Sequence, residues 1–209
     1  LSEFLRQTAP KGVDLAVATA PIQELDQHKA KAMELLGDVL PARPPTFCTG
    51  CPERPLFSAI RILEKDLGPT HVSCDIGCHT FSTLPPFNLG NTVLGYGLGL
   101  SSAAGVAPNF DKRVISIMGD GGFWHNGVTN GVGSALFNKA DGVLMVIKNG
   151  YTSATGWQYL PSTLRAREGR ATGSSIEGVI KSMGANWLRN VPNYKVGSVM
   201  KTLRQALTG

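Results

Sequence analysis

The chain has 209 residues, of which 42% are hydrophobic and 17% charged, with 25 Gly, 13 Pro and 4 Cys. This length and composition are typical of one globular domain, or of one domain with an extension, and exclude a disulfide-rich secreted miniprotein. The net charge of +5 is spread along the chain without a basic run, which argues against a nucleic-acid partner.

No apolar run approaches the roughly 20 residues that a membrane span requires, and residues 1–11 lack the pattern of a signal peptide. The sequence therefore predicts a cytoplasmic protein without a membrane partner. Because the first residue is Leu and not Met, we expect the chain to be part of a longer polypeptide.

Residues 1–42 are predicted to form an N-terminal arm or linker helix. The stretch PIQELDQHKAKAMELL at 21–36 carries apolar residues three or four positions apart, which is the period of a helix. The prolines at 41, 44 and 45 then break the chain and mark a boundary. We expect a single α/β domain from 43 to 209.

Within that domain, short β-branched apolar runs alternate with helical patterns. Helices are expected at 56–67, 94–106, 129–138, 175–183 and 196–207, and strands at 71–74, 114–118, 143–147 and 187–189. This alternation predicts a doubly wound parallel sheet that is covered by helices on both faces.

The motif Gly119-Asp120-Gly121-Gly122 follows the expected strand at 114–118, and Asn149 follows the next strand. In open α/β sheets, ligands bind at the carboxyl ends of the strands. A carboxylate and an amide oxygen suit Mg²⁺, and glycine amides at a helix start suit a phosphate. The alternative is that Asp120 serves only as a turn former or helix cap.

A second glycine-rich segment, GYGLGLSS at 95–102, nearly fits a dinucleotide-binding fingerprint. The segment before it contains Pro85, Pro86 and Gly90 and is a poor strand, which disfavours a nicotinamide site. Close helix packing is the better interpretation of these glycines.

The four cysteines form two closely spaced pairs. Cys48 and Cys51 make a Cys-x2-Cys pair, and Cys74 and Cys78 make a Cys-x3-Cys pair. Thiolates at this spacing suit either zinc or an iron–sulfur cluster, and the alternative is four unligated cysteines.

Taken in order, RPPTFCTGCPERP, DIGCHT, the span from GDGG to Asn149, and NGYTSATGWQ resemble the thiamine diphosphate-binding part of the 2-oxoacid:ferredoxin oxidoreductases. The large subunits of the indolepyruvate type are the most similar. The resemblance covers about residues 43–158. Lys148 departs from it, because the commoner motif ends in Asn-Asn.

The resemblance implies thiamine diphosphate and Mg²⁺ as cofactors. Asp120, Asn149 and the carbonyl of Tyr151 would be the Mg²⁺ ligands. Gly119, Gly121, Gly122, Thr152 and Ser153 would complete the cofactor-binding set. His79 and His125 are the candidate catalytic groups for proton transfer, and a purely structural role is the alternative for each.

By the same resemblance, Cys48, Cys51 and Cys78 would be ligands of a 4Fe-4S cluster. Three alternatives stay open: Cys74 is the fourth ligand, another chain supplies it, or the cluster is absent. The implied reaction is oxidative decarboxylation of a 2-oxo acid to acyl-coenzyme A and CO₂, with electrons leaving through iron–sulfur clusters to ferredoxin. The implied partners are a pyrimidine-binding domain, which carries the activating glutamate, and further oxidoreductase subunits.

Two other functions fit parts of the sequence. A non-oxidative thiamine decarboxylase or synthase would share Asp120 and Asn149 but would not need clustered cysteines. A zinc-stabilised interaction module would use the GDGG motif only as a turn. The aromatic residues Phe123, Trp124, Tyr151 and Trp157 suit an aryl 2-oxo acid but also suit core packing.

Overall fold

The structure is a computed structural model that describes residues 4, 7–37, 44–164 and 173–209. It divides into two compact units, Leu1–Pro44 and Pro45–Gly209. The first unit contains the long helix α2, Ala16–Leu36, which begins before the expected position and includes Pro21. None of the described helices combines the length and apolar character needed to cross a bilayer.

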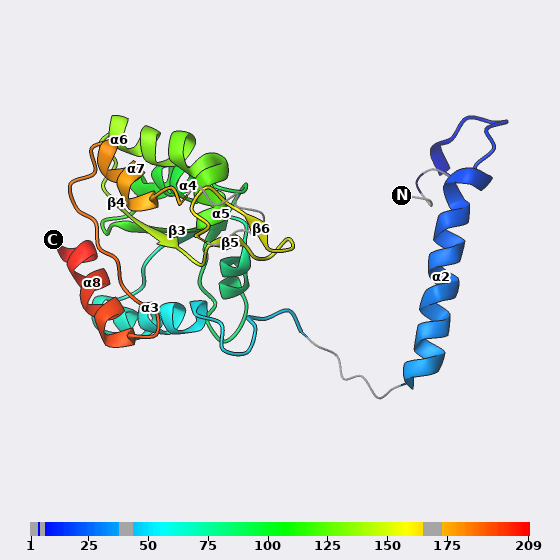
Figure 1. The fold of residues 1–209 in the computed structure, drawn as a ribbon, viewed down its shortest axis with the longest axis horizontal. Coiled ribbons are helices and arrows are strands. Elements are labelled where there is room, and N and C mark those ends of the chain that lie inside the picture. The colour runs from blue at the N-terminus through cyan, green and yellow to red at the C-terminus, as the bar shows by residue number, and fades with distance from the viewer. Residues whose placement is uncertain (1–3, 5–6, 38–43, 165–172) are drawn as a thin grey trace. The chain divides into compact units, whose positions relative to one another are not determined.

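The second unit is built on a parallel four-stranded sheet (Figure 1). The strand order is β2 (Thr92–Val93), β1 (Val72–Cys74), β3 (Val114–Gly119) and β4 (Gly142–Ile147). All three pairings are parallel, and β3 and β4 are in register from Val114↔Gly142 to Gly119↔Ile147. The residues that directly follow β3 and β4 therefore lie side by side at the carboxyl ends of the strands.

Helices cover both faces of the sheet, which confirms the doubly wound α/β fold. Helices α3 (Glu53–Leu67) and α8 (Val196–Thr208) lie on one side (Figure 1). The other side carries α4 (Gly99–Val106), α6 (Ser134–Phe137) and α7 (Ile176–Ser182). Each face buries its own hydrophobic cluster, because neighbouring residues of a strand point to opposite faces.

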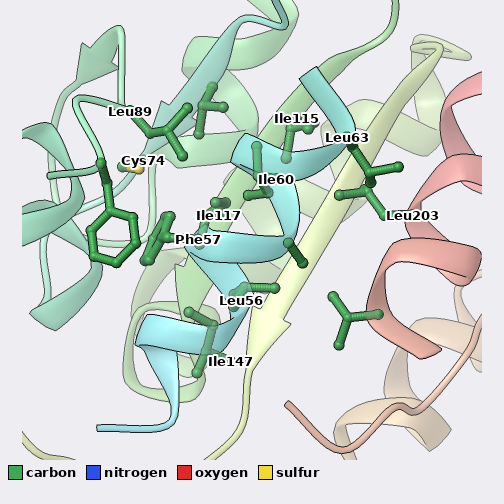
Figure 2. Packing of buried hydrophobic residues seen from close by; sticks show 14 of the residues in the cluster. Leu56, Phe57, Ile60, Leu63, Cys74, Leu89, Ile115, Ile117, Ile147 and Leu203 are labelled. Atoms are coloured by element: carbon green, nitrogen blue, oxygen red, sulfur yellow. The ribbon is translucent and has the colours of Figure 1, made fainter. Parts of the chain in front are cut away.

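The larger cluster packs α3 and α8 against the sheet. Figure 2 shows Phe57, Ile60 and Leu63 of α3 lying over Ile115 and Ile117 of β3. These apolar side chains recur every three or four residues, so one face of α3 is buried.

Several shorter elements complete the unit around the site. They are η2 (Cys78–Thr83), η3 (Ala107–Asn109), α5 (Asp120–Gly122), the π-helix η4 (Phe123–Gly133), and the antiparallel hairpin of β5 (Tyr151–Thr152) and β6 (Gln158–Tyr159). The helical stretch after β3 starts at Asp120, although the sequence pattern predicts a helix only from 129.

The strand predicted at 187–189 is wrong, because this segment has no ladder partner. The guanidinium of Arg189 lies 5.1 Å from the ring centroid of Trp187, and the Asn190 Nδ2 donates to Glu177 Oε1 of α7 at 3.1 Å. The strand β4 is therefore an edge strand of the described sheet.

Candidate functional site

The carboxylate of Asp120 joins the ends of β3 and β4. Its Oδ1 accepts the Gly121 N–H at 3.0 Å, and its Oδ2 accepts the N–H groups of Asn149 at 3.1 Å and Gly150 at 2.7 Å. Parallel pairing of β3 with β4 places these backbone donors at the same sheet edge as the carboxylate. Asp120 and Asn149, which lie in different motifs of the sequence, are thus brought together.

Asp120 is a buried carboxylate, only 1% exposed. Burial raises the pKa of its carboxyl group, and the backbone hydrogen bonds oppose that rise. No ion pair forms between Asp120 and a Lys, Arg or His within the described part of the chain. A buried carboxylate without a cationic side chain fits a divalent cation, which would supply the missing positive charge.

Asn149 is held in a tight turn at the start of the hairpin. Its Oδ1 accepts the Tyr151 N–H at 3.0 Å, and its Nδ2 donates to the Ser153 Oγ at 2.9 Å. An amide oxygen has a second lone pair, so Oδ1 can still ligate a hard cation. Asn149 is exposed, which leaves its side chain accessible to a ligand.

Two hydroxyl groups cover Gly121. A Cβ atom at this position would lie 2.6 Å from the Thr152 Oγ1 and would overlap the Tyr96 Oη. The two hydroxyl oxygens are 3.4 Å apart. The absence of a side chain at Gly121 thus makes room for hydroxyl donors beside a helix start, and such donors suit a diphosphate. The residues present fit a magnesium diphosphate group.

Asp75, which the sequence patterns do not single out, lies beneath this turn. It is fully buried directly after β1, its Oδ2 accepts the Gly97 N–H at 2.8 Å, and its Oδ1 forms a hydrogen bond with the His79 Nε2. Gly122 packs against the same carboxylate. Its position after a strand next to β3 is the signal that could have identified it, because both strand ends meet at one edge.

The two candidate catalytic histidines lie in different surroundings. His79 is 2% exposed, and its Cε1 is next to Gly77 and Gly119 beneath the turn. His125 is exposed on η4, with its ring centroid 5.0 Å from that of Tyr96. His125 is therefore open to a substrate, whereas His79 contacts the turn from inside; catalysis by either stays a prediction.

The glycine-rich segment at 95–102 packs closely against the site. Gly97 has φ +77°, and a Cβ atom there would overlap the Gly122 carbonyl and lie 2.9 Å from the Asn126 Cβ. A Cβ atom at Gly99 would lie 3.0 Å from the Asp75 nitrogen. These contacts support close packing as the role of the glycines.

Three of the four cysteines are neighbours near the start of α3. Burial raises the pKa of the Cys78 thiol to about 11, and nearby Glu53, Cys51 and Cys48 raise it further. Cys48 is exposed, and Cys51 and Cys78 are half-buried. Cys48 and Cys51 lie in one loop, which we name the cysteine loop. The Tyr194 hydroxyl holds this loop, because it donates to the Gly50 carbonyl at 2.6 Å.

Cys74 does not belong to that group. It is fully buried in the cluster under α3, near Leu89 and Phe57 (Figure 2). Its Sγ is 3.8 Å from the Ser82 Oγ, and burial raises its thiol pKa to about 12. Among the described residues, no three His, Cys, Asp or Glu side chains form a metal-binding group. Cys74 thus differs from the other three cysteines in being fully buried.

Glu53, at the start of α3, is a second residue that the sequence patterns do not single out. It is 4% exposed, and its Oε2 has no hydrogen-bond partner. Burial raises its pKa to about 7, nearby His79 lowers it, and nearby Asp75 raises it. Glu53 thus lies between the cysteine loop and the buried Asp75–His79 pair.

Residues 75–209 match the family described as thiamine pyrophosphate enzyme, C-terminal TPP binding domain. The matched residues include the turn at Asp120, the hairpin and His79. The chain belongs to the thiamine pyrophosphate enzymes. Thiamine pyrophosphate and thiamine diphosphate are the same cofactor, so the fit of the turn to a diphosphate agrees with the family.

Curated relatives of this thiamine pyrophosphate enzyme chain are indolepyruvate oxidoreductase subunits IorA. The subunit of Thermococcus kodakarensis is 31% identical, over 83% of this chain and 29% of the relative. That of Archaeoglobus fulgidus is 29% identical, over 94% of this chain and 31% of the relative. That of Pyrococcus horikoshii is 30% identical, over 88% of this chain and 30% of the relative. The chain thus spans about 30% of the length of these relatives.

Proposed function

We propose that this chain is the thiamine diphosphate-binding part of a 2-oxoacid oxidoreductase of the indolepyruvate type. The observation that carries the proposal is the Asp120 carboxylate, which is buried, unpaired with any described cation and held by the backbone where β4 ends. The family match and the names of the relatives support the cofactor and the substrate class.

In this proposal, Asp120, the Asn149 amide and the Tyr151 carbonyl hold Mg²⁺. The diphosphate binds against the Gly122 amide and the hydroxyls of Thr152 and Ser153, and Gly121, whose N–H donates to Asp120, leaves room for the Thr152 hydroxyl. When bound, the thiamine supplies the electron sink for decarboxylation, and the protein supplies anchoring, orientation and exclusion of water. His125, exposed beside Tyr96, is the better placed of the two histidines to exchange a proton with substrate.

The proposed reaction converts a 2-oxo acid, coenzyme A and two oxidised ferredoxins into acyl-coenzyme A, CO₂, a proton and two reduced ferredoxins. We expect a pyrimidine-binding domain to supply the activating glutamate and other subunits to carry iron–sulfur clusters. Because Cys74 is buried, a cluster at Cys48, Cys51 and Cys78 would need its fourth ligand from outside these four cysteines. The cytoplasmic location stays a prediction.

The test is the cofactor content of the anaerobically purified native complex with Asp120→Ala, beside Asp111→Ala, an exposed aspartate, as the control. We expect the wild-type and Asp111→Ala complexes to contain thiamine diphosphate, iron and sulfide. The Asp120→Ala complex should lose thiamine diphosphate and keep iron. Equal thiamine content in all three would refute the role of Asp120.

Two outcomes would favour the alternatives. Thiamine diphosphate without any iron, together with 2-oxo acid decarboxylation in the absence of an electron acceptor, would indicate the non-oxidative enzyme. Zinc without thiamine would indicate the interaction module, in which the GDGG motif is only a turn.

A further inference from the structure

Three aromatic rings gather on the hairpin that follows Asn149. Tyr151 of β5 and Tyr159 of β6 are directly opposite in the antiparallel ladder, so their side chains point to the same face. Their ring centroids are 6.0 Å apart, and the Trp157 ring is 5.7 Å from that of Tyr151. We name Tyr151, Trp157 and Tyr159 the aromatic face of the hairpin.

Part of this aromatic face is exposed. Trp157 is 68% exposed and Tyr159 is 45% exposed. Trp157 also has φ +61°, which is an unusual backbone conformation for a bulky residue. An exposed ring on a residue with an unfavourable backbone conformation, as at Trp157, suggests a function, because folding alone gains little from it.

The base of the hairpin is fixed to the proposed metal and diphosphate site. Gly150 donates its N–H to the Asp120 Oδ2 at 2.7 Å, and Thr152, next to Tyr151, contacts the Tyr96 hydroxyl beside Gly121. Two residues of extended chain span at most about 7 Å, so the Tyr151 backbone is no farther than this from that of Asn149. The first residue of the aromatic face therefore lies next to the proposed diphosphate site, on the same hairpin as Trp157 and Tyr159.

The other aromatic side chains of the GDGG motif do not contribute to this face. Phe123 is fully buried in the cluster against β3. The Trp124 Nε1 donates to the Ser162 Oγ at 2.9 Å, and its ring packs on the same cluster. The tertiary structure thus separates Phe123 and Trp124 from Tyr151 and Trp157, which the sequence analysis treats as one group.

We propose that Tyr151, Trp157 and Tyr159 bind the aryl group of the 2-oxo acid substrate. This inference rests on the proposed function and deepens it, because it names the residues that select the substrate. Planar rings pack in offset or edge-to-face arrangements with centroids 4.5–7 Å apart, so the exposed Trp157 ring can pack against an aryl group in the way that it packs against Tyr151, at 5.7 Å. A short alkyl 2-oxo acid would gain less from such a face, because it buries less apolar area and has no ring to stack.

The test uses the assembled native complex with Trp157→Ala, with Trp157→Phe as the conservative variant. The control is Phe137→Ala. Phe137 is 86% exposed and precedes β4, so it lies toward the amino ends of the strands, away from the hairpin that follows β4. Two quantities are measured: kcat/KM for indolepyruvate and for pyruvate, and the Kd of indole-3-propionate, an analogue that lacks the reactive ketone.

For Trp157→Ala, we expect the ratio of kcat/KM for indolepyruvate over pyruvate to fall about tenfold, mainly through KM, and the Kd of the analogue to rise about tenfold. Trp157→Phe should keep most of the wild-type kcat/KM ratio and most of the affinity for the analogue. Phe137→Ala should change neither the ratio nor the Kd. Tyr159→Ala should shift both quantities in the same direction, which provides a second test if Trp157→Ala does not assemble.

Equal loss of activity toward both substrates, or no change in either quantity, would overturn the inference. A lower yield of assembled complex without a change in the ratio would also overturn it, because the face would then be a subunit contact. If the wild-type complex consumes no 2-oxo acid, the proposed function itself fails, and this outcome is distinguishable from failure of the aromatic face.

Discussion

Gly122 packs so closely against the Asp75 carboxylate that a side chain at position 122 would overlap the Asp75 Oδ2. This contact joins the end of β1 to the helix start that carries Asp120. The same carboxylate accepts the Gly97 N–H and contacts His79, so three segments of the chain meet at one buried acid. The geometry of the GDGG turn therefore depends on Asp75.

Gly122→Ala should destabilise the chain by about 1–3 kcal/mol, because the added methyl group overpacks the site and displaces the Asp75 carboxylate. Thiamine diphosphate content should fall with it. The measurements are chemical denaturation and cofactor content. Gly131→Ala in η4 is the matched control, because its Cβ would meet the Leu100 Cβ of α4 at an ordinary 3.5 Å. Equal effects of both substitutions would contradict the packing argument.

Ile60→Ala should lower the free energy of unfolding by about 2–5 kcal/mol, because it leaves a cavity between α3 and the sheet. Ile60 is 1% exposed, whereas Ile62 on the same helix is 41% exposed. Ile62→Ala should therefore cost less than about 1 kcal/mol. Urea denaturation of both variants provides the comparison. A similar loss from both would mean that the face of α3 assigned as buried is incorrect.

Cys74→Ala should leave the iron content of the native complex unchanged, because Cys74 is fully buried, whereas Cys48 is exposed and Cys51 and Cys78 are half-buried. Cys51→Ala should lower the iron content if a cluster is bound at the cysteine loop. Iron and sulfide analysis of the two anaerobically purified variants separates the cases. Loss of iron from Cys74→Ala alone would show that Cys74 is a ligand.

Glu177→Gln should cost about 0.5 kcal/mol at neutral pH, because Lys148 Nζ lies 2.5 Å from Glu177 Oε1 in a partly exposed pair. The hydrogen bond from Lys148 is the main cause that lowers the pKa of Glu177. The stabilisation is therefore present above the unfolded value of about 4.3 and is lost as the pH falls through the lower folded value.

The measurement is the difference in unfolding free energy between the wild type and Glu177→Gln as a function of pH. The difference should shrink on acidification, and at neutral pH it should also shrink in about 1 M salt, which screens surface pairs. A difference that grows as the pH falls would show that the pKa of Glu177 is raised by folding and not lowered.

The segment at 187–189 shows why local patterns fail for short elements. Trp187, Leu188 and Arg189 suit a strand by residue type, but three residues carry little information on pairing. In the structure, Arg189 lies over the Trp187 ring and Asn190 donates to Glu177, and the second contact depends on how α7 packs. The hairpin was missed for the same reason, because each of its strands has only two residues.

The sequence by itself determined the parallel α/β fold and the location of Asp120 and Asn149 at one sheet edge. Both follow from periodicity and from the rule that parallel strands end on the same side, and both are properties of local segments. Only the tertiary structure decided that Asp75 supports the GDGG turn, that Cys74 is in the core, and that Phe123 and Trp157 lie in different surroundings. The physical reason is that burial and close contact depend on segments far apart in the chain, whose packing no local pattern contains.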